Sequence, residues 1–215
     1  MHVKLISISQ PVDDVTPDTA TLLAYQARVS STGNQNNHET GTKLLKSLIK
    51  RKEWSPFEMI HLGIEIHTTR DIARQILRHR SFSFQEFSQR YAKVEKELIP
   101  REVRLQDLVD RQNSIENTDT DLEKWWNDRQ YELGFRIHDL YDLALEQGIA
   151  KEVARAILPE GMTPSALYMA GTLRSWIHYV QLRADRKTQK EHRMIAERCK
   201  EILIERFPDL KEVFE

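Results

Sequence analysis

The 215-residue sequence contains one cysteine, Cys199, seven glycines and almost no net charge. A single cysteine excludes an internal disulfide and any zinc site that is built from several cysteines. The sequence has 32 Lys and Arg residues against 33 Asp and Glu residues, which gives a formal charge of -1. A general nucleic-acid coat protein carries a strong positive excess instead. Any basic chemistry in this chain must therefore be local.

Long apolar runs are also missing. No stretch approaches the roughly 20 residues that a membrane-spanning helix requires. Residues 1–6 lack the basic start, apolar core and small-residue cleavage site of a signal peptide. With 40% apolar and 30% charged residues, the composition is that of a globular chain that can bury a core. We therefore expect one domain over residues 1–215 and a cytoplasmic location.

The glycine-rich loops that hold phosphate in many nucleotide-binding proteins are absent as well. The sequence contains neither GxxxxGK[ST] nor GxGxxG, because its glycines are scattered. The eight histidines form no HExxH motif and no i, i+4 pair, so we assign no metal. A nucleotide bound to this chain must be held by side chains.

Hydrophobic periodicity predicts both strands and helices. Apolar and polar residues alternate over 3–10 and 59–67, which is typical of strands with one buried face. Helical spacing and start or stop signals predict helices over residues 17–27, 44–49, 71–79, 122–147 and 152–158, and two more within 173–207. The polar segments 31–38 and 110–121 are predicted to be loops, and the second is expected to be mobile.

Three helix starts carry capping signals. Thr16 precedes a proline and is expected to cap the first helix, whereas Ser55 to Glu58 and Thr188 to Glu191 have the form of capping boxes. Strands and helices do not alternate in strict βαβ order. The predicted fold class is therefore α/β of the α+β kind, with a mixed or antiparallel sheet surrounded by helices.

Residues 70–91 contain clustered arginines and other polar residues that an ordinary solvent-exposed surface does not fully explain. We expect Arg70 and Arg74 to be ordinary solvent-facing charges on a helix. The consecutive residues 78–80, Arg-His-Arg, stand where that helix should end, and a carboxylate, a hydroxyl and another arginine follow within about ten residues. Guanidinium and hydroxyl groups suit phosphate, and a carboxylate suits a sugar hydroxyl or a ring N–H. The segment therefore indicates a nucleotide site.

Residues 78–91 read RHRSFSFQEFSQRY and match every fixed position of RHRxxSxxExSxRY, the signature of the flavin-dependent thymidylate synthases. The sequence also resembles this family at WSPFE (54–58), EVAR (152–155), LRS (173–175) and LRAD (182–185). The resemblance covers most of the chain and is weakest between about 100 and 120. It implies the fold of this family and a homotetramer with active sites at subunit interfaces.

The resemblance also implies an activity. The family converts dUMP to dTMP with 5,10-methylenetetrahydrofolate as one-carbon donor and FAD, reduced by NADPH, as the source of reducing equivalents. The residues that would contact FAD are Ser55, Arg78, His79, Arg80, Glu86, Thr172, Arg174 and His178. Those that would contact dUMP are Gln75, Arg78, Glu86, Phe87, Ser88, Gln89, Arg90, Arg155 and Arg183.

Among these residues, Arg183 matches the arginine that polarises the uracil ring, so it is the expected catalytic residue. A guanidinium stays charged and can stabilise negative charge that develops on the ring. Arg174 and Arg183 are nine residues apart, which places them about 180° apart if one helix carries both. If both are functional, that helix lies between subunits. Cys199 has helical spacing with apolar residues and is predicted to be a buried, inert thiol.

This chain departs from the family pattern at three positions. Gln85 stands where Asn is usual, Glu53-Trp54 stands where many members carry His, and Thr172 replaces a common Asn. Ordinary structural roles also remain open: a helix cap for Ser55, a satisfied interior histidine for His178 and a helix ion pair with Glu152 for Arg155.

Two other functions remain open from the sequence. The basic residues 78–80 and the phenylalanines that follow combine charge with stacking surface, as in a single-stranded nucleic-acid-binding protein. A nucleotide-binding protein without turnover is the other possibility. We expect neither a nucleic-acid partner nor a membrane partner, because the net charge is close to zero and the chain lacks a membrane helix.

Overall fold

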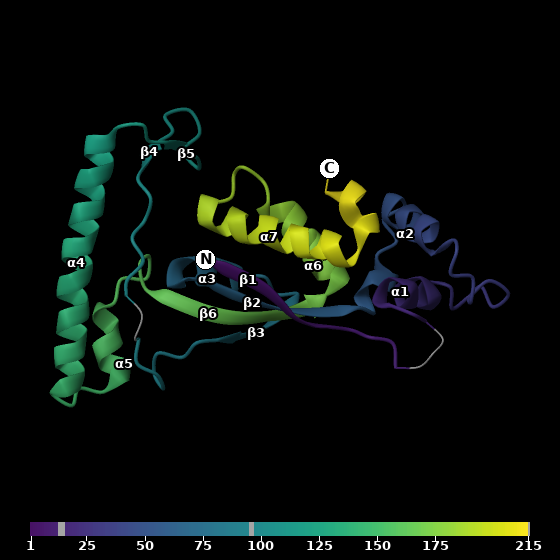
Figure 1. The fold of residues 1–215 in the computed structure, drawn as a ribbon, viewed down its shortest axis with the longest axis horizontal. Coiled ribbons are helices and arrows are strands. Elements are labelled where there is room, and N and C mark those ends of the chain that lie inside the picture. The colour runs from purple at the N-terminus through teal and green to yellow at the C-terminus, as the bar shows by residue number, and fades with distance from the viewer. Residues whose placement is uncertain (13–15, 95–96, 215) are drawn as a thin grey trace.

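Two long antiparallel strands, β2 (His61–Thr69) and β6 (Pro164–Thr172), form the centre of the main sheet. Their register pairs His61 with Thr172 and Thr69 with Pro164. Strand β1 (His2–Ile8) pairs with the other edge of β2, and β3 (Phe82–Glu86) pairs with the other edge of β6. The strand order is β1-β2-β6-β3 and all pairs are antiparallel, which confirms the predicted sheet (Figure 1).

The computed structural model describes residues 1–12, 16–94 and 97–214. Its α-helices are α1 (Thr19–Ala27), α2 (Gly41–Lys50), α3 (Arg70–Ile76), α4 (Thr120–Glu146), α5 (Lys151–Ala154), α6 (Leu173–Arg183) and α7 (Lys190–Arg206). Three short 3-10 helices are η1 (Ser55–Glu58), η2 (Arg155–Ile157) and η3 (Pro208–Val213). A separate pair of short antiparallel strands comprises β4 (Arg104–Gln106) and β5 (Ser114–Glu116).

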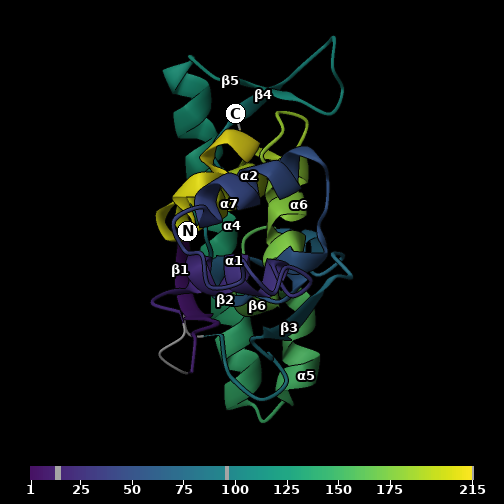
Figure 2. The same cartoon turned by 90° about the vertical axis from the view of Figure 1, so that its right-hand side faces the viewer.

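The core lies between one face of the sheet and the helices α3, α6 and α7. Alternation along β2 places Leu62, Ile64 and Ile66 on the buried face, each at most 1% exposed. Helices α6 and α7 cover that face, while α1 and α2 lie at one end of the molecule (Figures 1 and 2). Cys199 is fully buried on α7, and burial raises the pKa of its thiol, which confirms the predicted core cysteine.

Helix α4 stands at the end of the molecule opposite α1 and α2, with α5 beside it (Figure 1). Arg101 links this unit to the sheet. Its backbone N–H donates to Oε1 of Gln130 on α4 at 2.7 Å, and its guanidinium donates to Gly161 O at 3.0 Å and Asp71 Oδ1 at 2.6 Å. One partly buried arginine therefore fixes the long helix against the start of α3.

The central strand β6 and its neighbour β3 were not predicted from the sequence. The buried positions of β6 include Ser165 and Gly171, which carry no hydrophobic signal, and Tyr168 is half exposed on the other face. The apolar alternation is therefore interrupted, and periodicity does not reveal this strand. Strand β5 lies within the predicted loop 110–121, whose expected mobility stays a prediction.

The three predicted capping arrangements are wrong in detail. Helix α1 begins after Asp18, whose carboxylate accepts the N–H of Thr21 at 2.7 Å, rather than at Thr16. No side-chain cap hydrogen bond forms at Ser55, where the chain makes only a 3-10 turn. Helix α7 starts after Gln189 rather than Thr188 and has no side-chain cap, and the carboxylate of Glu191 pairs with Arg104 at 2.8 Å.

Among the described residues, no helix combines the length and apolar character needed to span a bilayer. The cytoplasmic location stays a prediction.

Gly171 is required by the close pairing of β6 with β3. A Cβ at this position would lie 2.5 Å from Cδ1 of Phe82, whose ring packs against Trp176 at 4.8 Å between centroids. We expect Gly171→Ala to lower the free energy of unfolding by about 1–3 kcal/mol, measured as a lower urea midpoint. Gly33→Ala is the control, because a Cβ there meets no described atom within 4 Å. Equal midpoints for both variants would contradict this account.

Candidate active site

The C-terminal ends of α3 and α6 meet over the covered face of the sheet. Helix α3 leaves the end of β2 and α6 leaves the end of β6, so the two helices start from opposite ends of an antiparallel pair. Where they approach each other, Nε of Arg183 donates a hydrogen bond to Nε2 of His79 at 2.9 Å. The expected catalytic arginine therefore contacts the RHR motif directly.

The His79 ring is neutral in this position. Partial burial lowers its pKa to about 4, and the charges of Arg183 and Arg78 add to the effect. A neutral ring can keep the lone pair on Nε2 that the guanidinium requires. His79 thus orients Arg183 through Nε and leaves its two terminal nitrogens for a ligand.

Other arginines at this turn have no ion pair within the described part of the chain. Arg78 and Arg80 are both exposed, and Gln75 lies one turn earlier on α3. Guanidinium groups without a carboxylate partner are suited to bind an anion. We call Gln75, Arg78, His79, Arg80 and Arg183 the turn group.

A second group of expected residues lies beyond β3. Glu86 pairs in register with Leu167, accepts a hydrogen bond from Ser165 Oγ at 2.8 Å and lies 3.6 Å from a nitrogen of Arg70. The Arg70 side chain is only 13% exposed, so its prediction as a solvent-facing charge is wrong. Arg74, in contrast, is 57% exposed as predicted, although it pairs with Glu160.

The residues after Glu86 lead towards α5. Gln89 is 3% exposed, and its Nε2 has no partner among the described residues. The Arg90 guanidinium lies 3.3 Å from the carboxylate of Glu152, which replaces the predicted ion pair between Glu152 and Arg155. We call Glu86 to Arg90 and Arg155 the strand-end group.

A third group surrounds the N-terminus of α6. The hydroxyl of Thr172 caps the helix by accepting the N–H of Ser175 at 3.2 Å. The Arg174 guanidinium pairs with Glu58, and its Nε is buried without a partner in the described structure. The His178 ring lies edge-on to the Trp54 ring, with 4.9 Å between the ring centroids. Partial burial lowers the pKa of His178, and the charge of Arg174 adds to the effect. With the exposed Ser55, these residues form the helix-start group.

The three groups do not form one pocket in a single chain. Thr172 and Leu167, the partner of Glu86, are five positions apart on β6, which corresponds to about 17 Å along the strand. Arg174 and Arg183 contact different neighbours, as their spacing predicts. Within the described residues, no hydrogen bond or ion pair joins Arg90 or Arg155 to Arg183.

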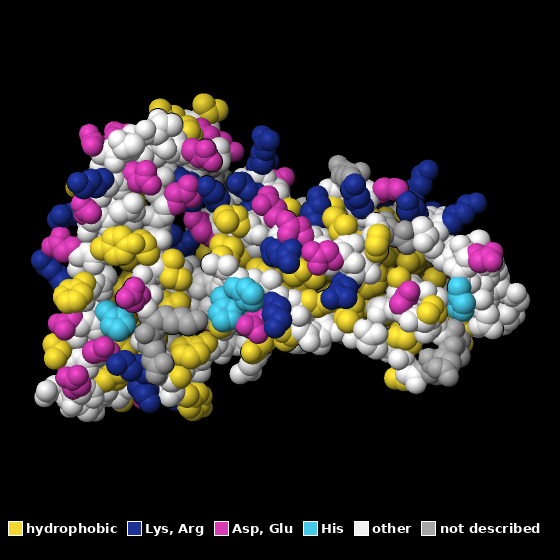
Figure 3. Space-filling model, in the orientation of Figure 1, with side chains coloured by type: hydrophobic (Ala, Val, Ile, Leu, Met, Phe, Trp, Pro, Cys, Tyr) yellow, Lys and Arg dark blue, Asp and Glu magenta, His cyan; other side chains and the backbone are white. Residues whose placement is uncertain are grey.

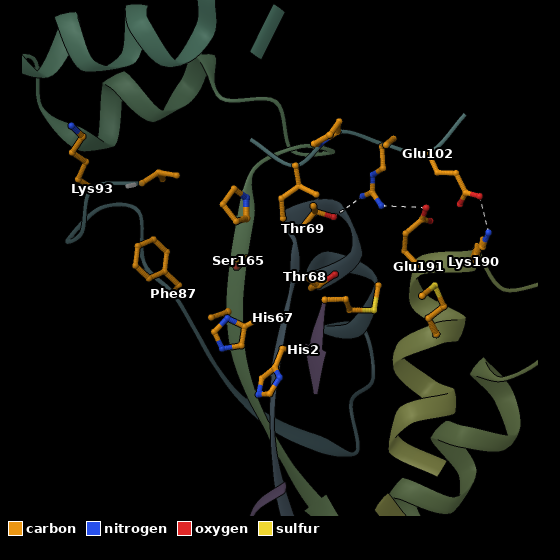
Figure 4. Close-up of a pocket in the computed structure, with 18 residues that line it drawn as sticks. His2, His67, Thr68, Thr69, Phe87, Lys93, Glu102, Ser165, Lys190 and Glu191 are labelled. Carbon is orange, nitrogen blue, oxygen red and sulfur yellow. Dashed lines mark hydrogen bonds and ion pairs between the residues drawn. The ribbon is translucent and has the colours of Figure 1, made fainter. Parts of the chain in front are cut away.

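A cavity of about 680 Å³ lies elsewhere, between the sheet end, α7 and the segment before α4 (Figure 4). Among the expected site residues, only Phe87 lines it. Its cations already have partners, since Arg101 pairs with Asp71 and Lys190 pairs with Glu102. Apart from Phe87, the expected nucleotide-binding residues therefore lie outside this cavity.

The phenylalanines of the motif are not free for stacking on nucleic-acid bases. Phe82 and Phe84 pack against the core, and the Phe82 ring contacts Trp176 and Tyr179. Only Phe87 is exposed, at 37%. This arrangement argues against a single-stranded nucleic-acid platform, which requires accessible rings.

The donor set suits a phosphate-bearing cofactor. Arg78 and Arg80 are exposed without carboxylate partners, and Nε of Arg174 is a buried orphan donor. No group of three or more His, Cys, Asp or Glu side chains that could hold a metal ion occurs in the described parts of the chain. The residues present therefore fit an anionic nucleotide cofactor.

Comparison with known proteins identifies the family. The family model of the thymidylate synthase complementing proteins matches residues 12–209. A probable flavin-dependent thymidylate synthase of Paramecium bursaria Chlorella virus 1 is 49% identical over 98% of this chain and 97% of its own length. The chain belongs to the flavin-dependent thymidylate synthase family. The flavin-dependent thymidylate synthase of Synechocystis sp. is 47% identical over 100% of both chains.

Solved structures agree with this assignment to the flavin-dependent thymidylate synthase family. The UMP/dUMP methylase PolB from Streptomyces cacaoi, bound with 5-Br dUMP, superposes with a TM-score of 0.83. It is 26% identical and the match covers 99% of this chain and 93% of that chain. The resemblance inferred from the RHR motif and the fold expected from it are confirmed.

Some residues next to the turn group were not foreseen. Tyr179, Gln189 and His192 form hydrogen bonds with one another or with Gln75, but they lie outside the family motifs named above. His192 and Gln75 are 117 positions apart in the sequence. Only the packing of α7 on α3 brings them together.

The neutral state of His79 makes stability depend on pH. Its pKa is about 4 in the folded chain and about 6.5 in an unfolded one, so the unfolded chain takes up the proton first as pH falls. The contribution of His79 to stability should be fully present above about pH 6.5 and decrease as pH falls towards 4. His79→Gln keeps an acceptor for Arg183 and should show a shallower decrease in urea midpoint. Superimposable pH profiles would contradict this.

Proposed function

We propose that the protein catalyses the reductive methylation of dUMP to dTMP. The one-carbon donor is 5,10-methylenetetrahydrofolate, and NADPH is the reductant of a bound FAD. The observation that carries the proposal is the intact RHRxxSxxExSxRY segment, folded so that its histidine contacts Arg183. Membership of the family and the names of the relatives support it.

In this proposal the three groups divide the ligands between them. FAD would be held by Arg78, His79, Arg80 and Glu86 together with the helix-start group of Ser55, Thr172, Arg174 and His178. When bound, FAD supplies the reducing equivalents. The substrate dUMP would be held by Gln75, Arg78 and Arg183 of the turn group and by the strand-end residues Glu86, Phe87, Ser88, Gln89, Arg90 and Arg155. Arginines and Ser88 suit the phosphate, and Glu86 suits a donor on the nucleoside.

Arg183 would act on the uracil ring. Its Nε is engaged by His79, so the terminal nitrogens are pre-oriented to donate to ring oxygens or N3, where negative charge develops during substitution at C5. No cysteine is available for attack on the pyrimidine, because Cys199 is fully buried and its thiol pKa is raised. Positioning and charge stabilisation therefore carry the proposed catalysis.

The assembly proposed with this function is a homotetramer whose sites lie between subunits. The strand-end and helix-start groups are separated on one chain, so a second copy would bring them to one ligand. Apolar side chains also reach the surface at the end of the molecule that α4 occupies (Figure 3). On α4, Tyr131, Leu133 and Phe135 are 63%, 52% and 74% exposed. Exposed apolar area of this kind marks protein interfaces.

The proposed function is tested by colour and turnover. Purified protein should bind FAD and be yellow, lose its colour with NADPH, and form dTMP from dUMP only when 5,10-methylenetetrahydrofolate is present. Product formation is measured by chromatography. A protein that stays colourless with added FAD, or that binds FAD and dUMP without forming dTMP, would refute the assignment.

Arg183→Ala separates chemistry from cofactor binding. We expect dTMP formation to fall by about 100-fold or more, because a donor aimed at developing charge is lost. The flavin spectrum and FAD content should be retained. Arg186→Ala, an exposed neighbour beyond α6, is the matched control and should turn over normally. Normal turnover of Arg183→Ala would remove Arg183 from the catalytic role.

Sharing of the site between chains is tested by mixing inactive variants. Arg183→Ala removes one residue of the turn group and Arg90→Ala removes one residue of the strand-end group. Each variant should therefore be inactive alone. Co-expressed chains with two affinity tags should regain part of the activity, since some sites combine two intact halves. Mixing Arg183→Ala with Arg78→Ala should restore nothing, because both changes affect the same group. Absence of recovery in verified mixed assemblies would contradict sites between subunits.

A further inference from the structure

A fully buried histidine lies directly behind the turn group. His192, in the first turn of α7, is 0% exposed, and both of its ring nitrogens have partners. Nδ1 lies 3.3 Å from Oε1 of Gln75, and Nε2 lies 3.1 Å from the hydroxyl of Tyr179. The Tyr179 side chain is 1% exposed. The histidine therefore connects a core tyrosine with a residue expected to contact the substrate.

A chain of hydrogen bonds runs from Glu191 through Gln189, Gln75 and His192 to Tyr179. The carboxylate of Glu191 sets the direction of these hydrogen bonds. The Glu191 carboxylate can only accept, so the amide nitrogen of Gln189 faces it at 3.0 Å. The amide oxygen of Gln189 then faces Gln75 and accepts from its Nε2 at 2.8 Å. The amide oxygen of Gln75 consequently points inward, towards His192.

The orientation of Gln75 determines which ring nitrogen of His192 carries the proton. Oε1 of Gln75 accepts, so Nδ1 of His192 must carry the proton. Burial, followed by the nearby charge of Arg183, lowers the pKa of His192 to about 3, so the ring is neutral. Nε2 therefore keeps its lone pair and accepts from Tyr179, whose phenol pKa burial raises.

This network determines what Gln75 can offer to a ligand. One amide hydrogen is used by Gln189 and the carbonyl oxygen is used by His192, which leaves the second amide hydrogen available. A donor is what an acceptor oxygen of a pyrimidine nucleotide requires. If the amide rotated by 180°, the carbonyl oxygen would lie in place of that donor.

We propose that His192, held by Tyr179, is a positioning residue that fixes the Gln75 amide with its N–H group towards the nucleotide. His192 itself does not contact the substrate. This inference rests on the proposed binding of dUMP, and it adds a residue outside the family motifs to the substrate site.

The test measures the affinity of the FAD-loaded protein for dUMP by calorimetry. His192→Leu removes both ring nitrogens and should weaken dUMP binding about tenfold, which corresponds to about 1.4 kcal/mol. His192→Asn keeps an amide donor on the Nδ1 side and should recover most of the affinity. FAD content should be unchanged in both variants. A merely structural role predicts no rescue by Asn.

A double-mutant cycle with Gln75 isolates the positioning effect. In a Gln75→Ala background, His192→Leu should no longer change dUMP affinity, because there is no amide left to orient. If His192→Leu fails to fold, Tyr179→Phe takes its place: it removes only the hydroxyl that donates to Nε2 of His192 and should weaken dUMP binding by a smaller factor. An equal loss with and without Gln75, or unchanged affinity in Tyr179→Phe, would overturn the proposal.

These outcomes are separate from those that test the proposed function. If the wild-type protein binds no dUMP, the proposed function fails and no variant is needed to show it. If the wild type binds dUMP and methylates it while the cycle shows no coupling, the inference about His192 fails alone.

Discussion

The antiparallel pairing of β2 with β6 determines where the functional side chains meet. Nine paired residues span about 30 Å, and each strand passes directly into a helix at its C-terminal end, β2 into α3 and β6 into α6. Helices of seven and eleven residues span about 10 Å and 16 Å. Their sum nearly equals the strand length, so helices that start at opposite ends and lie over the same face meet near the middle. That is where Arg183 contacts His79.

The same pairing keeps the other expected residues apart. Thr172 lies at one end of β6, and Glu86 pairs with a residue five positions away on the same strand. The helix-start and strand-end groups of one chain therefore cannot both contact a single small ligand. Proteins solve this problem by symmetry, because a second copy can present the missing group at a distance that the fold of one chain forbids. The separation of the groups is thus a consequence of strand register, and it is the physical basis for expecting shared sites.

Local signals predicted much of this molecule, and long-range pairing explains what they missed. The alternation in residues 59–67 predicted β2 because large apolar side chains line its buried face. Strand β6 escaped detection because Ser165 and Gly171 occupy buried positions, and at Gly171 the Phe82 ring leaves no room for a Cβ. The expected site residues of the RHR motif could be named from the sequence, since they are contiguous, and their roles stay predictions. Arg70 was misjudged because its carboxylate partner Glu86 reaches it only through the sheet.

Buried histidines explain how a cluster of arginines can be ordered without carboxylates. Burial disfavours a protonated imidazole, and the charges of Arg183 and Arg78 add repulsion, so the rings of His79 and His192 stay neutral. A neutral ring has one donor and one acceptor, so His79 can accept from the Arg183 guanidinium and His192 can donate to the Gln75 amide. A carboxylate in either position would neutralise the arginines and compete with an anionic ligand. Neutral imidazoles thus provide order while the positive charge remains available for the nucleotide.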